Sequence, residues 1–233
     1  MIPLDSQLRT KLQKYGHEQL EGAVIDGDTT TTATTNINDI AATGAQGGTE
    51  LYLLFNGFRK SCLVTTTANS RSAAGGLTAE DYLETVKLMG TAGIDALDAS
   101  KVSFIVDPLT HYANCALPEV KTKDVYSRAT IENGFVTSLY GYGVRPSANI
   151  CRASANRLSN TAGKVDQDTT TNNLYGSILA VRWDKWKFGF QRQMTMETTR
   201  FAASDTNEIV AFMSAGLIQR DTEASAITYY VGV

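Results

Sequence analysis

The sequence predicts an α+β fold, with helices in its first half and mainly short strands in its second half. Three observations lead to this prediction. The opening residues have an amphipathic helical period, the stretch from Val102 to Val106 is β-branched and aromatic, and brief apolar runs alternate with Gly, Tyr and Thr after Pro118. With 233 residues, 42% of them hydrophobic, the chain can bury a core of its own.

Apolar residues recur at three- and four-residue steps along the opening segment, with Gln, Arg, Lys and Glu between them. The period predicts one helix of about twenty residues, ended by the glycine in Ile25–Asp28. If this stripe faces the core, Leu8→Asp destabilises the subunit by several kcal/mol through a buried charge, whereas Arg9→Glu is mild. The stripe consists of Leu4, Leu8, Leu12, Tyr15, Leu20 and Val24.

The next two stretches contrast in polarity. Thr29–Thr49 is rich in Thr, Asn, Ala and Gly, too polar for a core, and predicts an extended, loosely held loop. Leu51–Val64 is apolar and contains an Asn56-Gly57 turn signal. It favours short buried segments on either side of that turn, with a helical turn over Leu51–Phe55 as the alternative.

A helix, a strand and a second helix follow. Thr78 and Asp81 resemble a capping box at the start of a helix that continues through Met89. Val102–Val106 predicts a strand, and the Asp107-Pro108 pair predicts its end and the start of a helix that runs toward Leu117.

The second half predicts strands separated by turns. Leu139–Val144 and Ile178–Val181 have strand composition, and Ile227–Val231 predicts a closing strand. Ile209–Leu217 fits a strand or a helix equally well. The polar segment Arg157–Asn173 has no apolar period and predicts an exposed, mobile loop.

Composition excludes several classes of function. Only 19% of residues are charged and the formal net charge is −3, which argues against a dedicated nucleic-acid binder. The cysteines Cys62, Cys115 and Cys151 have no C-x-x-C spacing and predict reduced, structural thiols. No segment has the apolar length of a signal peptide or a membrane span, so we expect no membrane partner.

Few residues offer chemistry. His17 lies on the polar side of the first helix, and His111 and Cys115 are four residues apart on a helix, which fits a packed face better than a metal site. The sequence contains no phosphate-binding or nucleophile motif, and no feature in it indicates a partly buried carboxyl suited to acid-base catalysis. We therefore predict no enzyme activity, no cofactor and no metal.

Arg182–Phe188 interleaves bases and aromatics, as single-stranded nucleic-acid platforms do. In an acidic chain, a packed strand or a protein interface is the favoured interpretation, because Trp and Arg are enriched at interfaces.

Four stretches resemble, in order, one protein family. LRTKLQKYGHEQLEGAVIDGD looks like a long spine helix, and KVSFIVDPLTHYANCALPEV like the strand and helix of a peripheral domain. The third stretch is similar to a segment in which a glycine and a valine precede the central region of the chain: FVTSLYGYGVRPSANI. The fourth looks like a C-terminal strand pair with a charged turn: GSILAVRWDKWKFGFQRQMTMETTRFAASDTNEIVAFMSAGLIQRD. Together they resemble the major capsid proteins of tailed double-stranded-DNA phages, which have the Hong Kong 97-like fold.

The resemblance implies a spine helix with a β-sheet peripheral domain (1–117, completed by 207–233) and a mixed α/β axial domain (118–206). It implies self-assembly through rings of five and six subunits into an icosahedral shell around phage DNA, bound without sequence specificity. The protein would be made in the host cytoplasm and reside in the virion, with portal, scaffolding or decoration proteins as further partners. The candidate assembly contacts are Tyr140, Tyr142, Arg145, Trp183 and Trp186.

One departure from the family pattern concerns the N-terminus. Family members carry an extended arm and a long hairpin loop ahead of the spine helix, whereas here the helical period begins at Leu4. We therefore expect the chain to lack both. The alternatives are an encapsulin-type shell protein, which shares the fold, and a β-rich tail or adhesin module that binds a ligand through Tyr140, Tyr142, Trp183 and Trp186.

Overall fold

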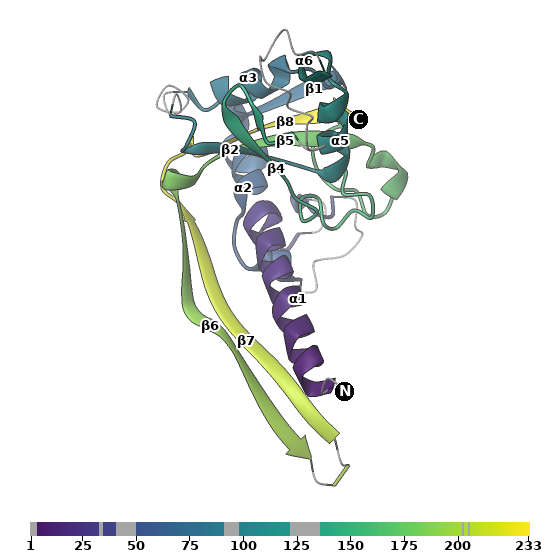
Figure 1. The fold of residues 1–233 in the computed structure, drawn as a ribbon, viewed down its shortest axis with the longest axis vertical. Helices are drawn as coiled ribbons and strands as arrows, with labels where there is room; N and C mark the ends of the chain where they lie inside the picture. The colour runs from purple at the N-terminus through teal and green to yellow at the C-terminus, as the bar shows by residue number, and fades with distance from the viewer. Residues whose placement is uncertain are drawn as a thin grey trace.

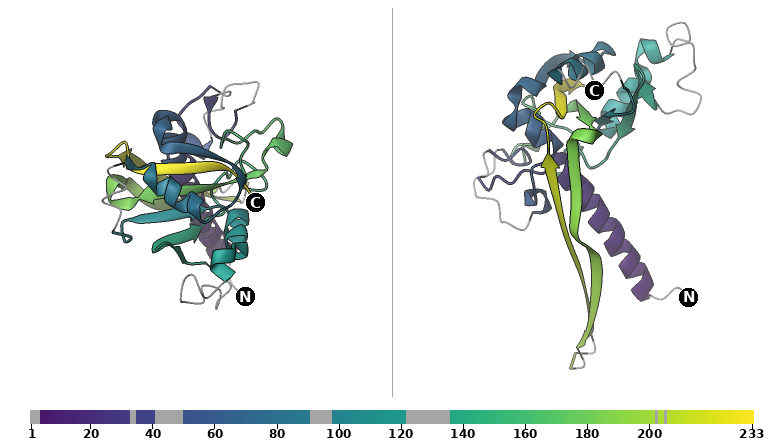
Figure 2. Two further views of the ribbon diagram at one scale, coloured as in Figure 1. Left: turned by 90° about the horizontal axis from the view of Figure 1, so that it is seen from above. Right: turned by 90° about the vertical axis from the view of Figure 1, so that its left-hand side faces the viewer.

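A computed structural model of the chain describes residues 4–32, 35–40, 50–90, 98–121, 136–201, 203–204 and 206–233. Figures 1 and 2 show a body built around one sheet, with a long helix and a long hairpin that extend from it. In chain order the elements are α1 (Leu4–Asp26), η2 (Leu51–Leu53), α2 (Phe58–Lys60), η3 (Ser61–Thr65), η4 (Thr67–Asn69), β1 (Ser70–Gly76), α3 (Glu80–Lys87), β2 (Val102–Val106), α5 (Pro108–Ala116), α6 (Pro118–Lys121), β3 (Ser138–Leu139), β4 (Tyr142–Pro146), η5 (Thr170–Asn172), β5 (Tyr175–Arg182), η6 (Trp183–Lys185), β6 (Trp186–Phe201), β7 (Thr206–Gln219) and β8 (Ser225–Gly232).

The six-stranded sheet of the body has the order β1-β8-β5-β2-β4-β3. β8 runs parallel to β1 and antiparallel to β5, and β2 runs antiparallel to β5 and parallel to β4. The sheet therefore combines strands from residues 1–117, 118–206 and 207–233, so the two domains expected from the sequence share it.

Both faces of this sheet are buried. Successive side chains of its central strands point to opposite sides, and each side packs in a core cluster. Phe104 and Val106 of β2 pack in one core cluster with Tyr82 of α3, whereas Ile105 packs in another with Phe58 of α2. The central strands are almost entirely apolar for this reason. The body is thus a three-layer structure, with helices on one face and α2, the end of α1 and irregular segments on the other.

We call α1 together with the β6–β7 hairpin the limb. The hairpin is a separate two-stranded sheet inserted between β5 and β8, two antiparallel neighbours of the main sheet. Its pairing shifts register between Phe190 and Arg192 and again between Arg192 and Thr195. In Figure 1 α1 and the hairpin both extend downward from the body.

The structure confirms the long opening helix but not the burial of its whole stripe. Leu8 is 46% exposed and Tyr15 is 56% exposed, whereas Leu20 is buried. Only the last turns of α1 lie against the body, so the expected burial of Leu8 is wrong, and with it the basis for a loss of several kcal/mol in Leu8→Asp. None of the described helices is long and apolar enough to cross a membrane.

The strand and helix predictions around β2, α5, β5 and β8 are confirmed, and Ile209–Leu217 is a strand, within β7. In Leu51–Val64 the alternative of a helical turn over Leu51–Phe55 is confirmed as the 3-10 turn η2. The segment after Gly57 is also helical, as α2 and a π-helical turn at Ser61–Thr65. The predicted Thr78–Asp81 pair forms at the start of α3, because the Thr78 backbone N–H and hydroxyl both donate to Asp81 Oδ2, but the N-cap residue is Ala79, which makes no side-chain cap.

Both predicted polar loops contain buried residues. In the first, Asn36, Ile37 and Asn38 are at most 1% exposed, and residues 41–49 lie outside the described part of the chain. In the second, Val165 is fully buried and Asp166 accepts hydrogen bonds from Thr169 N and Asn172 Nδ2. Side-chain amides and carboxylates satisfy the backbone of these loops, which allows polar sequence to pack inside.

Candidate assembly surfaces

A buried ion pair connects the end of α1 to the body. Arg59 Nη1 lies 2.6 Å from Asp26 Oδ1, and the Arg59 side chain is fully buried. Arg59 Nη2 donates to the Gly163 carbonyl, and Asp26 Oδ2 accepts from Arg152 N at 3.2 Å. Burial acts to lower the pKa of Arg59, but the Asp26 carboxylate and nearby groups outweigh it and raise the pKa. The Arg59 guanidinium therefore stays charged inside the protein.

A second ion pair lies beside the first. Lys60 Nζ is 3.0 Å from Asp28 Oδ2, and it also donates to Thr30 Oγ1. Asp28 is fully buried and accepts from Ile37 N at 2.9 Å. Consecutive bases on α2 thus bind carboxylates at the end of α1, so α2 holds the helix and the loop after it in place.

Two glycines allow the backbone to cross closely at this junction. Gly57 N donates to Gly27 O at 2.8 Å. A Cβ on Gly57 would lie 2.6 Å from Gly27 N and 2.7 Å from Val24 O, closer than real atoms approach. The crossing therefore requires glycine, and it sets the direction in which α1 leaves the body.

Within the limb, the hairpin rests on α1 at three levels. Near the body, Leu20 and Ala23 of α1 pack in a cluster that also contains Met213 of β7. Further out, the Met194 side chain fills the space left by the absent Cβ of Gly16. Near the free end, Arg9 Nη2 donates to Thr198 Oγ1 at 2.5 Å. The helix thus sets the position of the hairpin along most of its length.

Much of the limb's apolar surface is uncovered. Between α1 and the hairpin is a groove of about 280 Å³, lined mostly by apolar side chains. Tyr15, Leu54 and Phe212 along this groove are 56%, 52% and 41% exposed. On β6, Phe188 and Phe190 are 42% and 44% exposed and stack edge to face. Exposed apolar surface of this extent is typical of protein interaction sites.

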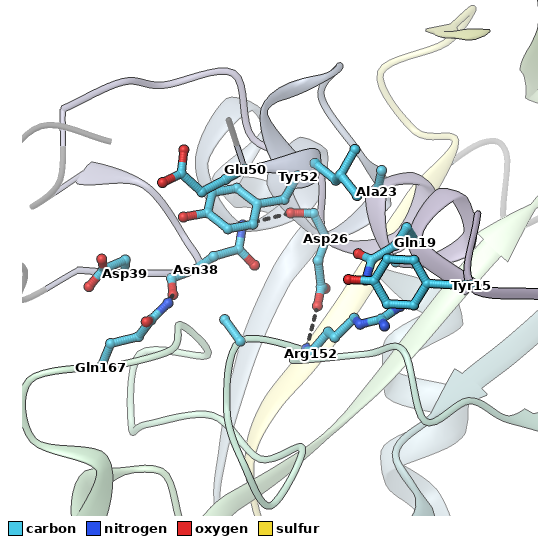
Figure 3. Close-up of a pocket in the computed structure, with 13 residues that line it drawn as sticks. Tyr15, Gln19, Ala23, Asp26, Asn38, Asp39, Glu50, Tyr52, Arg152 and Gln167 are labelled. Atoms are coloured by element: carbon cyan, nitrogen blue, oxygen red, sulfur yellow. Dashed lines mark hydrogen bonds between the residues drawn. The ribbon is translucent and has the colours of Figure 1, made fainter. Parts of the chain in front are cut away.

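A polar pocket of about 460 Å³ lies where α1 meets the loops of the body. Figure 3 shows Asp39, Glu50 and Tyr52 on one side of it and Arg152 and Tyr15 on the other. Burial, and then the negative charges of Glu50, Asp39 and Asp28, raise the pKa of Tyr52 to about 12. The pocket thus has a negative wall, and Arg152 lies over the Tyr15 ring at 5.9 Å.

The five residues predicted from sequence as assembly contacts lie in different environments. Tyr142 and Trp186 are each 8% exposed and pack in the two core clusters, which leaves little of them for a neighbour. Tyr140 is partly buried, with φ of 52°, in the turn between β3 and β4. Trp183 is 38% exposed, with the exposed Arg145 guanidinium 5.9 Å from its ring. Their role in assembly stays a prediction.

Arg182–Phe188 is not one exposed strand. It passes from β5 through the turn η6 into β6, so it connects the body to the hairpin. Trp183 Nε1 donates to Ser103 Oγ at 3.0 Å, and Trp186 Nε1 donates to Ala224 O at 3.2 Å. Both indoles also stack edge to face on Phe58. The segment therefore holds the base of the hairpin.

The described residues contain no group of three or more His, Cys, Asp or Glu side chains placed to hold a metal ion. Cys115 Sγ donates to the His111 carbonyl, as expected for a helix neighbour. Cys62 and Cys151 are buried, and burial raises the pKa of each thiol to about 12. Thiols with such a pKa are unreactive at neutral pH.

Comparison with known proteins gives structural matches only. No protein-family model matches the sequence, and no curated protein matches it. The satellite phage P4 procapsid including size determination (Sid) protein matches with TM-score 0.54 and 8% identity, over 100% of this chain and 69% of that chain. The bacteriophage PhiM1 mature capsid matches with TM-score 0.52 and 13% identity, over 92% and 61%. The capsid of cyanophage P-SCSP1u matches with TM-score 0.51 and 14% identity, over 100% and 68%.

These matches define the class of fold to which the chain belongs. The chain has a phage major capsid protein fold, with mixed helices and sheets. It spans 61 to 69% of the length of these solved chains, and 58% of a matched chain of Mycobacterium phage Che8. Identities of 8 to 14% establish a shared fold and nothing finer.

Proposed function

We propose that the chain is a structural capsid subunit of the Hong Kong 97-like type, which assembles with its own copies into an icosahedral shell around phage DNA. The observation that carries the proposal is the limb. Its hairpin has strands of 16 and 14 residues, and nearly all of their side chains are exposed or only partly buried. A two-stranded hairpin is marginally stable alone in water, so a hairpin this long needs further contacts.

A shell of repeated copies supplies such contacts. Strands of 14 residues reach about 46 Å from the body at 3.3 Å per residue, far enough to lie against a neighbouring subunit. Head-to-tail contacts between identical copies close into rings, and several weak contacts per subunit add up to a stable assembly. Rings of five and six subunits are the form that we expect.

The proposal keeps a peripheral and an axial domain, but it defines them by their position in the fold and not by residue ranges. The sequence places residues 1–117 and 207–233 in the first and 118–206 in the second, yet all three stretches contribute strands to one sheet. We therefore assign the limb to the peripheral domain and the body to the axial domain. Portal, scaffolding or decoration proteins and the packaged DNA remain proposed partners, and the virion the proposed location.

The alternatives differ in what they predict for the purified protein. An encapsulin-type shell shares this fold, and it would enclose protein rather than DNA. A β-rich tail or adhesin module would not need α1, whose contact with the hairpin is part of this structure. The proposal is a structural role and not an enzyme, in line with the solved phage capsids of similar fold.

Light scattering of the purified chain, followed by negative-stain imaging of large species, tests the proposal. We expect closed shells or rings of five and six copies. A protein that stays monomeric at every concentration would contradict the proposal. Nucleic acid recovered from shells made in infected cells would separate a phage capsid from an encapsulin.

A further inference from the structure

A pocket of about 310 Å³ lies on the body where the end of α1 meets the main sheet. Its walls come from α1, α2, β2, β4 and η6. Most of the side chains that line it are apolar: Val24, Ile25, Phe58, Ile105, Pro146 and Trp183. An apolar cavity of about 150 Å³ binds benzene. The pocket is therefore large enough to take an aromatic side chain.

One charged group at this pocket has no counterion within the subunit. The Arg145 guanidinium is exposed and lies 5.9 Å from the Trp183 ring. Glu21 also lines the pocket, but its two carboxylate oxygens accept from Ser147 Oγ at 2.7 Å and from Asn149 Nδ2 at 2.9 Å. No ion pair between described residues includes Arg145. An apolar pocket thus lies beside a cation that is free to bind a carboxylate.

The outer end of the hairpin carries the complementary groups. Phe201 is 48% exposed, and Glu208 is exposed and takes part in none of the ion pairs of the described chain. Glu208 lies opposite Thr199, two residues before Phe201, so the carboxylate and the ring are diagonal neighbours on one face. Thr198 contacts Arg9 of α1, and side chains alternate along a strand, so this face turns away from α1.

We propose that the hairpin end of one copy docks into this pocket on a neighbouring copy, with the Phe201 ring in the pocket and Glu208 paired with Arg145. The inference rests on the proposed function and names one of its contacts. Diagonal neighbours in a hairpin lie roughly 7 to 8 Å apart. The Arg145 guanidinium is 5.9 Å from the Trp183 ring, so one hairpin end can reach both.

A second copy is the occupant because one chain cannot bring the two surfaces together. The hairpin ends far from the body, at the outer end of the limb (Figure 1). The hairpin end and the pocket are different surfaces, so each copy docks its hairpin on one neighbour and receives the hairpin of another. Head-to-tail contacts of this kind close into rings. The contact is smaller than the roughly 800 Å² per partner of a stable interface, so it acts together with other contacts of the ring.

Exchange of the two charges tests the proposal in the full chain. Arg145→Glu and Glu208→Arg each bring two like charges together at the contact. We expect each to raise the protein concentration at which half of the chain is assembled, measured by sedimentation velocity, about tenfold or more. The double variant Arg145→Glu/Glu208→Arg restores the attraction with its sign exchanged, and we expect a concentration within about threefold of the parent.

Arg220→Glu is the matched control, because Arg220 is exposed and lies outside the pocket. It should leave the concentration for assembly unchanged. Thermal melting of the unassembled chains checks that every variant folds. Single reversals without effect, or a double variant that assembles no better than either single one, would overturn the inference and leave the proposed function standing.

Disulfide trapping gives a second readout that needs no charge reversal. Under mild oxidation, a mixture of Arg145→Cys and Glu208→Cys chains should form a cross-linked pair that contains one chain of each kind. A mixture of Arg220→Cys and Glu208→Cys chains should not. Equal cross-linking in the two mixtures would also overturn the inference alone. A parent that never assembles would overturn both proposals.

Discussion

Among single residues, the buried ion pair of Arg59 with Asp26 should contribute most to the stability of the junction. In Asp26→Asn the buried guanidinium keeps its charge but loses its counterion. We expect a loss of about 3 to 5 kcal/mol in the free energy of unfolding, measured by urea denaturation. The exposed pair Lys14–Glu18, 3.8 Å apart, is the control, and Glu18→Gln should change stability by less than about 0.5 kcal/mol. Similar losses in both variants would contradict this account of the junction.

His111 gives the subunit a pH dependence whose sign follows from its burial. Burial lowers the pKa of His111 below its ordinary value of 6.5. The unfolded chain therefore binds a proton first as pH falls through about 6.5, and the folded state loses stability. We expect the stability difference between the parent and His111→Gln to narrow between about pH 8 and about pH 5. A stability difference for His111→Gln that stays constant over this pH range would contradict the prediction.

Sequence reasoning did not single out Arg59 or Lys60 at the junction. Their partners Asp26 and Asp28 lie 33 and 32 residues away in the chain. Nothing in the local pattern shows that these bases are buried, because Arg and Lys are mostly surface residues. The sequence feature nearest to this site is Asp26-Gly27-Asp28 at the end of the helix, and it indicates only where the helix ends.

At the scale of elements, α1 divides into a half that the body buries and a half that it leaves exposed. Leu20→Asp puts a charge into the cluster with Ala23 and Phe55, and we expect it to cost several kcal/mol. Leu8→Asp should change the stability of the unassembled subunit by less than about 0.5 kcal/mol. Melting curves of the two variants measure the difference. Equal melting temperatures would contradict this division of the helix.

Gly57, which lies against the end of α1, and Gly16, which lies within α1, should respond oppositely to alanine. Gly57→Ala forces a Cβ against the backbone of Gly27 and Val24, and we expect a loss of about 1 to 3 kcal/mol. Gly16→Ala meets only the flexible end of Met194, and alanine favours the helix by up to about 1 kcal/mol. Urea denaturation of both variants checks the signs. A stabilised Gly57→Ala protein would show that the crossing is looser than described.

Elements with a strong period could be predicted from sequence, whereas those built from tertiary contacts could not. The opening helix, β2, α5 and β8 follow from spacing, turn residues and capping. Of the helical turns between residues 51 and 65, the sequence offers only the first, as an alternative. The others are three to five residues long and depend on their packing. The burial of Asn36 and Asn38 depends on side-chain hydrogen bonds to distant backbone, which composition does not reveal.

For the whole molecule, the limb and the body should be separable in function. The lower hairpin has few contacts with the body, so replacing residues 196–211 by an Asn-Gly turn leaves Thr195 and Phe212 as a short hairpin end. We expect this protein to melt within a few degrees of the parent but to form no shells. Scanning calorimetry and light scattering measure the two properties. Normal shells from the shortened protein would show that the outer hairpin is dispensable for assembly.

The order of helices and strands could be predicted from sequence, but the arrangement of the sheet could not. The resemblance to capsid proteins rested on that order, and the fold bears it out. The parallel pairing of β1 with β8, however, joins Ser70 to Ile227. No local pattern specifies a partner that far along the chain. The expected exposure of the loop at Arg157–Asn173 holds for residues 167–172 but not for Val165 and Asp166, which pack against other segments.

The position of β8 between β1 and β5 has a consequence for biosynthesis. β1 leaves the ribosome about 150 residues before the strand that pairs with it, so the main sheet stays open through most of translation. Long-range pairing of this kind is slow, and the apolar faces of β2 and β5 remain exposed until it is complete. A nascent chain therefore has no finished surface to offer to a neighbour, and chaperones have time to act before any subunit becomes competent to join another.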